Sequence, residues 1–369
     1  MTRVIIGWLA VLILAITQQF LAPPVPGVIL VLVLAGVVVI ISICSFGVVT
    51  QAEKLAQRMG DPYGSLVLTI SIVLIEVILI SAVMLGPGDH TTIGRDSVMA
   101  VSMIIMNLVI GIAVLLATRK HGPLVHNRTG TASYSTMLIA LLTVAFVLPG
   151  QLDANGSYPP GIAAIIAIGT LATYAYFLYR QMFHQPGDFA ETDPIGIRAA
   201  GEASGITAQP PIAETFAKHR AEILQRIILL VITVIPVVIL AQYMAQLLDD
   251  GLGRTQLPIE LAGVLIAAIV FLPETITSLR AGSAGELQRV VNLCHGALVS
   301  TVSVTIPAVL LIGLVTGQTV VLAESSSNMV LLAATMIITV SNFSAPKITV
   351  MHALPHLMLF IVYVLLLFQ

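Results

Sequence analysis

Residues 64–86 read GSLVLTISIVLIEVILISAVMLG, and residues 259–281 read IELAGVLIAAIVFLPETITSLRA. Both stretches are long enough to cross a membrane, and each holds a glutamate well inside it, Glu76 in the first and Glu274 in the second. A carboxylate near the centre of a bilayer costs about 2.5–3.5 kcal/mol on insertion scales, so an acid there is a candidate functional group. The two stretches therefore predict a membrane protein whose function depends on two buried acids.

The composition agrees with a membrane protein. Hydrophobic residues make up 57% of the chain and charged residues 9%, and the mean hydropathy is +1.03. Soluble domains contain roughly 25% charged residues. The formal net charge of −2 gives no indication of nucleic-acid binding. Cys44 and Cys294 both lie in apolar segments without ligand spacing around them, so we expect small packing residues rather than a disulfide or a metal pair.

The hydropathy predicts an all-α polytopic membrane protein. Because a hydrocarbon core of about 30 Å needs roughly 20 apolar residues per helix, we predict about eleven transmembrane helices. They lie near residues 4–21, 27–49, 64–86, 97–117, 134–150, 159–179, 227–248, 259–281, 290–314, 328–344 and 351–368. The ninth is long, and we expect it to be broken or tilted. The first is interpreted as a helix rather than a signal peptide, because no small-residue cleavage site follows it.

The distribution of basic residues predicts the orientation. With eleven helices, every Lys and Arg except Arg95 and Arg254 falls on the side of the N-terminus. Lys and Arg are enriched in cytoplasmic loops. We therefore predict a multi-pass protein of the plasma (inner) membrane, with its N-terminus in the cytoplasm and its C-terminus outside.

A polar segment divides the predicted helices into two sets. The predicted parts are an extra N-terminal transmembrane helix in 1–26, a first five-helix repeat in 27–180, a cytoplasmic loop in 181–225 and a second five-helix repeat in 226–369. We interpret the loop as a flexible linker rather than a regulatory segment. It is expected to end in a helix, with the i,i+4 pairs Glu214/Lys218 and Glu222/Arg226. Five is an odd number, so the second repeat enters the membrane inverted, an arrangement typical of secondary transporters.

An offset of 198 residues aligns polar side chains of the two predicted repeats, because 274 − 76 = 198. It places Glu76 on Glu274, Ser102 on Ser300 and Asn107 on Thr305. Side-chain identity is otherwise poor, and chance recurrence of polar residues is the alternative interpretation. We predict that these six residues bind cations and protons, with Glu76 and Glu274 as the metal ligands.

Further oxygen and nitrogen side chains lie near these positions. The accessory candidates are Thr69, Thr277, Ser278, Ser303 and His295. For each Ser or Thr, hydrogen bonding between helices is an equally good interpretation. A single membrane histidine such as His295 is more often a packing group than a proton relay. Two carboxylates with neutral oxygens suit a hard cation such as Ca²⁺ or Na⁺, and no Cys/His cluster favours a softer metal.

The chemistry of two neighbouring acids indicates how exchange could work. Empty and ionised, the two carboxylates would repel each other and be poorly solvated, so we expect protons to occupy the site when a metal does not. A bound cation favours the ionised form. Occupancy by either metal or protons, but not both, is the physical basis of exchange.

Two segments resemble those of a known family. One runs from Gly60-Asp61-Pro62-Tyr63-Gly64 to Ile75-Glu76-Val77, and the other from Pro273-Glu274-Thr275 to Thr305-Ile306-Pro307. They are similar to the calcium/cation antiporter superfamily, and more closely to its bacterial calcium/proton (sodium or potassium/proton) antiporters. The resemblance implies two inverted five-helix repeats after an extra helix, cation exchange by alternating access, and Glu76 and Glu274 as ligands.

The chain differs from the family pattern at one pair of residues in each repeat. The Gly-Asn pair that often precedes the glutamate is replaced by Ile72-Val73 in the first repeat and by Val270-Phe271 in the second. The replacements remove amide ligands, which favours Na⁺ or K⁺ relative to Ca²⁺.

We thus predict a transporter rather than an enzyme, one that exports Ca²⁺, or Na⁺ or K⁺, in exchange for H⁺. Its expected partners are small inorganic cations, protons and the lipid bilayer, with no cofactor and no nucleic acid. The alternatives are a sodium or potassium/proton antiporter with little Ca²⁺ transport, and a cation channel. A hydrolase that uses Glu274 and His295 around a metal is disfavoured, because the chain lacks an H-E-x-x-H pair.

Overall fold

The computed structural model describes residues 2–21, 24–59, 63–86, 90–190, 212–255, 258 and 260–369. These residues form helices joined by turns, with two isolated β-bridges, Leu124–Ile348 and Ser157–Val321, and no strand among them. The predicted all-helical fold is therefore confirmed.

Each predicted segment coincides with a helix or with consecutive helices. In chain order these are α1 (Thr2–Thr17), η1 (Gln18–Leu21), α2 (Gly27–Met59), α3 (Tyr63–Met84), α4 (Ile93–Met103), η2 (Ile104–Val109), α5 (Ile110–His121), α6 (Arg128–Leu142), η3 (Thr143–Val147), α7 (Pro149–Leu152), α8 (Pro160–Tyr179), η4 (Arg180–His184), η5 (Pro186–Phe189), α9 (Ile212–Thr255), α10 (Glu260–Val270), α11 (Leu272–Ala284), α12 (Leu287–Thr316), α13 (Ser326–Ser344) and α14 (Val350–Leu366). The short elements η2, η3 and η4 are π-helical turns.

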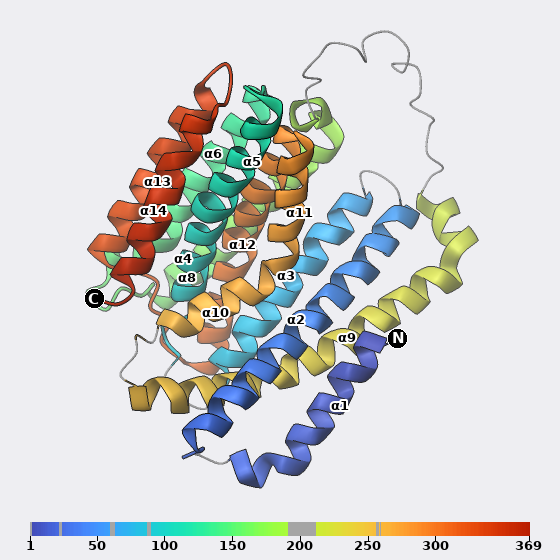
Figure 1. Ribbon diagram of the computed structural model, residues 1–369, viewed down its shortest axis with the longest axis vertical. Helices are drawn as coiled ribbons and strands as arrows, with labels where there is room; N and C mark the ends of the chain where they lie inside the picture. Colours follow the sequence, from blue (N-terminus) through green and yellow to red (C-terminus); the bar gives the residue numbers. More distant parts are fainter. Residues whose placement is uncertain are drawn as a thin grey trace.

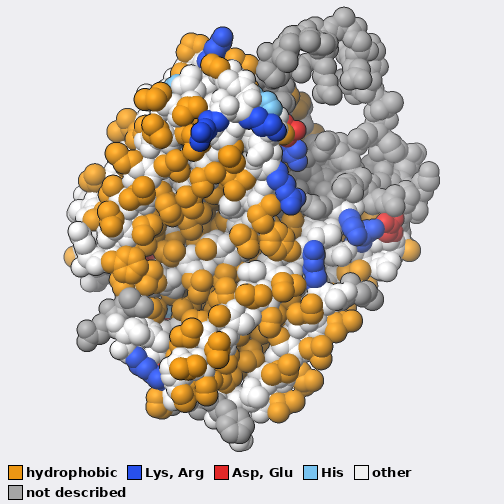
Figure 2. Space-filling view, viewed as in Figure 1, with side chains coloured by type: hydrophobic (Ala, Val, Ile, Leu, Met, Phe, Trp, Pro, Cys, Tyr) orange, Lys and Arg blue, Asp and Glu red, His pale blue; other side chains and the backbone are white. Residues whose placement is uncertain are grey.

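Most of these helices have the length and composition of membrane spans. Seven described helices are long and apolar enough to cross a bilayer, and the bent pair α10–α11 would make an eighth. Thr2–Thr17 and Val350–Leu366 are shorter apolar helices, and Val73–Met84 is the part of α3 whose side chains are described. Hydrophobic side chains cover broad areas of the face in Figure 2, as expected for a surface in lipid. The count of eleven spans stays a prediction.

Three helices form a layer along one side of the bundle. In Figure 1, α1, α2 and the long α9 lie together on the lower right, and α9 packs against α1, α2 and α3. Their close approach depends on a small residue, because a Cβ on Gly7 would lie 2.8 Å from Cys44 Sγ and 3.1 Å from Pro236. Cys44 and Cys294 are both buried, as expected of packing residues.

The remaining helices surround α12. This helix packs against α3, α6, α8 and α11, while α4 packs on α10, and α5 packs on α11 and α14. Helices of the two predicted repeats therefore alternate in the interior, so that residues far apart in the sequence meet there.

The irregular helix in the second half is not the one we expected. The ninth predicted segment is a continuous helix, α12, although Pro307 lies within it. Its 30 residues span about 45 Å, longer than the hydrocarbon core. The break falls in the eighth segment instead, where α10 and α11 are bent by 56°. Pro273 begins α11 there, and a proline in a helix interior removes a backbone hydrogen bond.

The start of the predicted cytoplasmic loop differs from a flexible linker, because residues 181–190 pack onto the bundle. Gln181 Nε2 donates to the hydroxyl of Tyr134 at 2.6 Å, and Asn292 Nδ2 donates to the carbonyl of Phe189 at 2.6 Å. Residues 191–211 lie outside the described residues.

The loop ends in a helix as predicted, since α9 begins at Ile212 and continues directly into the membrane span. Glu222 and Arg226 form the predicted ion pair at 2.6 Å. The side chains of Glu214 and Lys218 lie outside the described residues.

Several basic residues gather at one end of the bundle. Arg128 donates to the carbonyl of Ser344, and Lys120 Nζ donates to the carbonyl of Ser283 at 3.0 Å, so three connections between helices meet there. Arg95 lies in a different environment, where it binds Asp96 and the carbonyl of Ala323. This segregation agrees with the charge asymmetry in the sequence, and the cytoplasmic assignment of the basic end stays a prediction.

Candidate cation and proton site

Glu76 lies in the second half of α3 and is fully enclosed. Its side chain is 1% exposed. Thr301, which α12 contributes, donates its hydroxyl proton to Glu76 Oε2 at 2.6 Å. Thr305 is one turn further along α12 and is close enough to Glu76 to interact with its carboxyl group. Oε1 has no hydrogen-bond partner among the described residues, so this oxygen can accept a proton or a cation.

Glu274 occupies the first turn of α11, immediately after the bend. The N-terminus of a helix carries a partial positive charge, which stabilises a carboxylate placed there. Broken helices whose ends point at an ion site near the membrane centre are a recurring feature of secondary transporters. The break at Pro273 therefore creates a helix end at the position of the acid.

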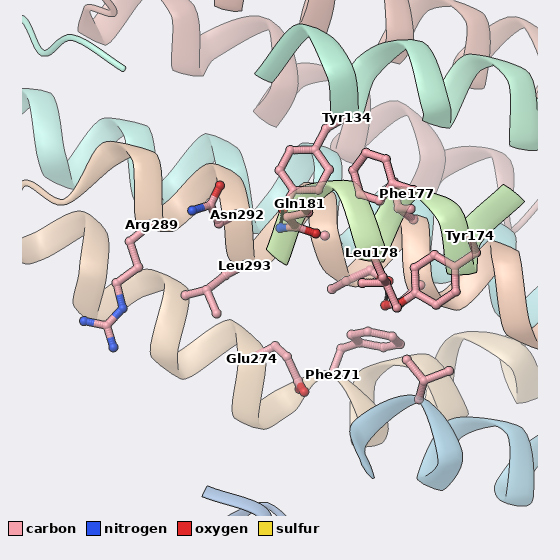
Figure 3. A pocket seen from close by; sticks show the side chains of 15 residues that line it. Tyr134, Tyr174, Phe177, Leu178, Gln181, Phe271, Glu274, Arg289, Asn292 and Leu293 are labelled. Atoms are coloured by element: carbon pink, nitrogen blue, oxygen red, sulfur yellow. Dashed lines mark hydrogen bonds between the residues drawn. The ribbon is translucent and has the colours of Figure 1, made fainter. Parts of the chain in front are cut away.

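Glu274 also lines a cavity of about 320 Å³. Figure 3 shows its side chain beside Phe271, facing aromatic residues of α8 across the cavity. A water molecule occupies about 30 Å³ in the liquid, so the cavity can hold several waters and an ion. Arg289, in the first turn of α12, also lines the cavity, as do Asn292 and Gln181. The cavity thus connects Glu274 with the end of the bundle where Lys and Arg residues gather.

The two glutamates belong to one electrostatic environment. Both are buried, Glu76 at 1% and Glu274 at 9% exposure, so neither faces lipid. Their carboxyl groups are close enough for the charges to repel each other. Helix α12 packs against both α3 and α11 and therefore lies beside both acids.

Several of the predicted Ser and Thr residues make hydrogen bonds within the protein. Ser102 and Ser300 each donate to a carbonyl of their own helix at 2.7 Å, and Thr277 does so at 2.9 Å. Ser278 accepts a hydrogen bond from Cys294 at 3.6 Å, between α11 and α12. Of these residues, Ser300 also lines the cavity that contains Glu274. A hydroxyl that donates to the backbone still offers its oxygen lone pairs to a cation.

Ser303 and Thr305 differ from this group. Both are fully buried on α12, and neither hydroxyl has a hydrogen-bond partner of ordinary geometry among the described residues. Their oxygens can therefore contact an ion or water. The side chain of Thr69 lies outside the described residues.

Asn107 and His295 lie in a second group of buried polar side chains. Asn107 is on the π-helical turn η2, where its Nδ2 donates to Thr335 at 2.8 Å and its Oδ1 lies 3.2 Å from Nδ1 of His356. His295 is fully buried on α12, with its ring 6.1 Å from that of Tyr134. The contacts of Asn107 and His295 are thus with α6, α13 and α14.

Thr301 hydrogen-bonds Glu76 but was not among the predicted cation ligands. The spacing could have identified it, because Thr301 and Thr305 are four residues apart and share a face of α12. No such spacing identifies Tyr174, Phe177 and Leu178 of α8, which line the cavity. Their positions depend on how α8 packs against α12.

The sequence of this chain is similar to a known protein family and to a known antiporter. The pattern of a family described as sodium/calcium exchanger protein matches residues 29–183 and 226–369. The sodium-potassium/proton antiporter ChaA of Escherichia coli strain K12 is 30% identical over 332 residues, which cover 88% of this chain and 85% of ChaA.

Solved structures show the same fold at low sequence identity. A structure of native YfkE superposes with a TM-score of 0.73 at 15% identity and covers 99% of both chains. The H⁺/Ca²⁺ exchanger CAX superposes with a TM-score of 0.68 at 15% identity, covering 99% of this chain and 88% of CAX.

Proposed function

Because this chain belongs to the sodium/calcium exchanger protein family, we propose that it is a secondary active antiporter that exchanges a small hard cation for H⁺. The observation that carries the proposal is the pair Glu76 and Glu274. The two carboxyl groups come from different halves of the chain, are buried, and interact electrostatically. Glu76, Glu274 and the hydroxyl groups of Ser300, Thr301 and Thr305 are the proposed cation ligands.

The physical cycle follows from the charge of the pair. When both acids are ionised and the site is empty, two negative charges lie in a region that solvates them poorly. Protons or a metal cation can neutralise the charges, and neither can be added once the other fills the site. Only the loaded forms then change conformation at low cost, which couples cation movement to proton movement in opposite directions.

The cavity indicates which state of the cycle this structure represents. It connects Glu274 with the basic end of the bundle. On the predicted orientation that end is cytoplasmic, so the site faces inward. The cation would enter here, displace protons into the cytoplasm and be released outside, in the plasma membrane.

For the cation, we propose Na⁺ or K⁺ before Ca²⁺. Ca²⁺ takes six to eight oxygen ligands, usually with several carboxylates, and this site offers two carboxylates and hydroxyls. The Gly-Asn pairs of the wider family are absent. ChaA, whose name gives sodium, potassium and protons as its ions, is 30% identical.

Transport in everted membrane vesicles tests the function. Respiration acidifies the lumen and quenches a pH-sensitive dye, and Na⁺, K⁺ or Ca²⁺ is then added separately. We expect rapid dequenching with Na⁺ or K⁺ and little with Ca²⁺. Dequenching with Ca²⁺ alone would assign the protein to calcium/proton exchange. A cation flux that never runs against its gradient would instead indicate a channel.

A further inference from the structure

Three histidines lie in a row inside the bundle, next to the cavity but outside its wall. His126 precedes α6, His295 is on α12 and His356 is on α14. Their exposures are 6%, 0% and 1%. His295 contacts Tyr134, which lines the cavity (Figure 3), and His295 itself is not among the lining residues.

The three side chains are connected through Phe343 and by the electrostatic interaction of their rings. His126 Nε2 lies 2.9 Å from the carbonyl of Phe343. The rings of His126 and His295 both lie edge-on to the Phe343 ring, each with a centroid distance of 5.3 Å. His295 and His356 are close enough for their charges to interact. Beyond His295, His356 Nδ1 lies 3.2 Å from Asn107 Oδ1. Asn107 Nδ2 in turn donates to the hydroxyl of Thr335 at 2.8 Å.

Four ring nitrogens along this row are buried without a hydrogen bond of ordinary geometry to another described residue. They are His126 Nδ1, both ring nitrogens of His295 and His356 Nε2. A buried polar group left unsatisfied costs about 1–3 kcal/mol. Internal water is the ordinary partner of such groups. We therefore expect internal water beside these four ring nitrogens.

The row has one end near the basic end of the bundle and the other at η2. His126 is two residues from Arg128, which binds Ser344 at the basic end. At the other end, Asn107 belongs to η2, which packs against α11 and α12, the helices that carry Glu274 and Thr301. A resident metal does not account for the row, because the described residues contain no group of three or more His, Cys, Asp or Glu able to hold one.

We propose that His126, His295 and His356, with the water between them, conduct protons between the basic end and the interior, separately from the cation cavity. The inference rests on the proposed antiport. Each neutral imidazole accepts a proton on one nitrogen and releases one from the other, so the ring returns to its starting state after a rotation or a reverse transfer. Asn107, whose amide is engaged by Thr335 and His356, belongs to this row and is not assigned as a metal ligand.

The groups that face the row set its electrostatics. Tyr134 of α6 and the other two histidines face His295, Arg128 lies near His126, and His352 lies near His356. Burial and the Arg128 charge lower the pKa of His126, which lies outside the membrane spans. A neutral ring is the form that can relay a proton without trapping it.

The test compares two transport modes of the full-length protein in proteoliposomes. One mode is exchange of Na⁺ for H⁺, followed with an internal pH dye, and the other is exchange of radiolabelled Na⁺ for unlabelled Na⁺ at fixed pH. We expect His295→Phe to slow the proton-coupled mode roughly tenfold or more, the scale of a lost proton-transfer group. The Na⁺/Na⁺ mode should change less than about twofold.

Further variants separate a proton path from a packing role. His295→Gln and His126→Leu should show the same selective loss, and His184→Gln, which changes an exposed histidine outside the row, should leave both modes intact. Equal slowing of both modes in every row variant, or no change in either, would overturn the inference. A wild-type protein that exchanges Na⁺ for Na⁺ but moves no protons would overturn the proposed function as well.

Discussion

The two halves of the molecule place their glutamates by opposite means. In the first half, Glu76 lies within an unbroken helix, α3, and the next membrane helix is interrupted by the π-helical turn η2. In the second half, the helix that carries the glutamate is broken, and the next helix, α12, is continuous over 30 residues. Two positions that align in the sequence thus differ in local structure.

The difference changes what compensates each negative charge. Glu274 lies at a helix N-terminus, where backbone N–H groups and the helix dipole favour an anion, and it borders the cavity. Glu76 lies in the interior of α3 rather than at a helix end, and its described hydrogen-bond partner is the hydroxyl of Thr301. On the proposed function, a cation from the basic end would meet Glu274, which lines the cavity, before Glu76, which does not line it.

Removing either charge should have the largest effect. Glu76→Gln and Glu274→Gln keep the side-chain shape. The neutral amide of Gln carries no negative charge and does not take up a proton. Breaking a buried charged interaction costs about 3–5 kcal/mol, so we expect exchange to fall by about 100-fold or more in both variants. The measurement is dye dequenching in everted vesicles, with Glu222→Gln on α9 as the matched control. Robust exchange in one of the two variants would show that only the other acid is essential.

Disturbing the close packing between helices of the two halves should have the next largest effect, which is a loss of stability. A Cβ on Gly282 of α11 would lie 2.7 Å from the carbonyl oxygen of Ala113, which is backbone and cannot move aside. A Cβ on Gly111 of α5 would meet mainly the end of the Leu357 side chain, which can rotate. Gly282→Ala should therefore destabilise the protein by about 1–3 kcal/mol and Gly111→Ala by less. Thermal unfolding in detergent measures both.

Gly169→Ala is the control for that pair, because nothing lies within 4 Å of a Cβ at this position. Equal melting temperatures for Gly282→Ala and Gly169→Ala would mean that α11 and α5 are less tightly packed than described.

Changing the bend between α10 and α11 should lower the exchange rate less than removing the charge of Glu274. Pro273→Ala restores a backbone N–H and allows a straighter path through α10 and α11, which displaces Glu274. We expect the exchange rate to fall by about tenfold, equivalent to about 1.4 kcal/mol. Pro307→Ala on the continuous α12 should change the rate by less than about twofold. If the two proline variants behave alike, the break does not position the acid.

The smallest effect is expected from the hydroxyl beside Glu76. Thr301→Val removes the O–H that donates to the carboxyl group and preserves the side-chain shape. A hydrogen bond of this kind contributes about 1 kcal/mol, so the half-saturating cation concentration should rise about fivefold. Thr277→Val, on the helix of Glu274, should shift it less than about twofold, because that hydroxyl binds its own backbone at 2.9 Å. Equal shifts of the half-saturating concentration in the two variants would mean that the Thr301 hydroxyl does not support Glu76 more than the Thr277 hydroxyl supports Glu274.

Much of the fold was predictable because membrane helices leave a strong signal. Long apolar runs fix where the helices lie, and each predicted segment coincides with helical structure. The burial of Glu76 and Glu274 was predictable too, since an acid in an apolar run avoids lipid by facing the interior. The location of the break was harder to predict, because Pro273 and Pro307 both lie within apolar segments and only one of them interrupts a helix.

The sequence by itself determined that this is an all-helical membrane protein with two intramembrane acids, because apolar length and isolated charge are properties of the chain alone. Only the tertiary structure decided which side chains surround those acids. The contact of Thr301 with Glu76 joins residues 225 positions apart, and the row from His126 to His356 draws on the α5–α6 connection, α12 and α14. Such contacts depend on the packing of whole helices around α12, and local sequence does not encode that packing.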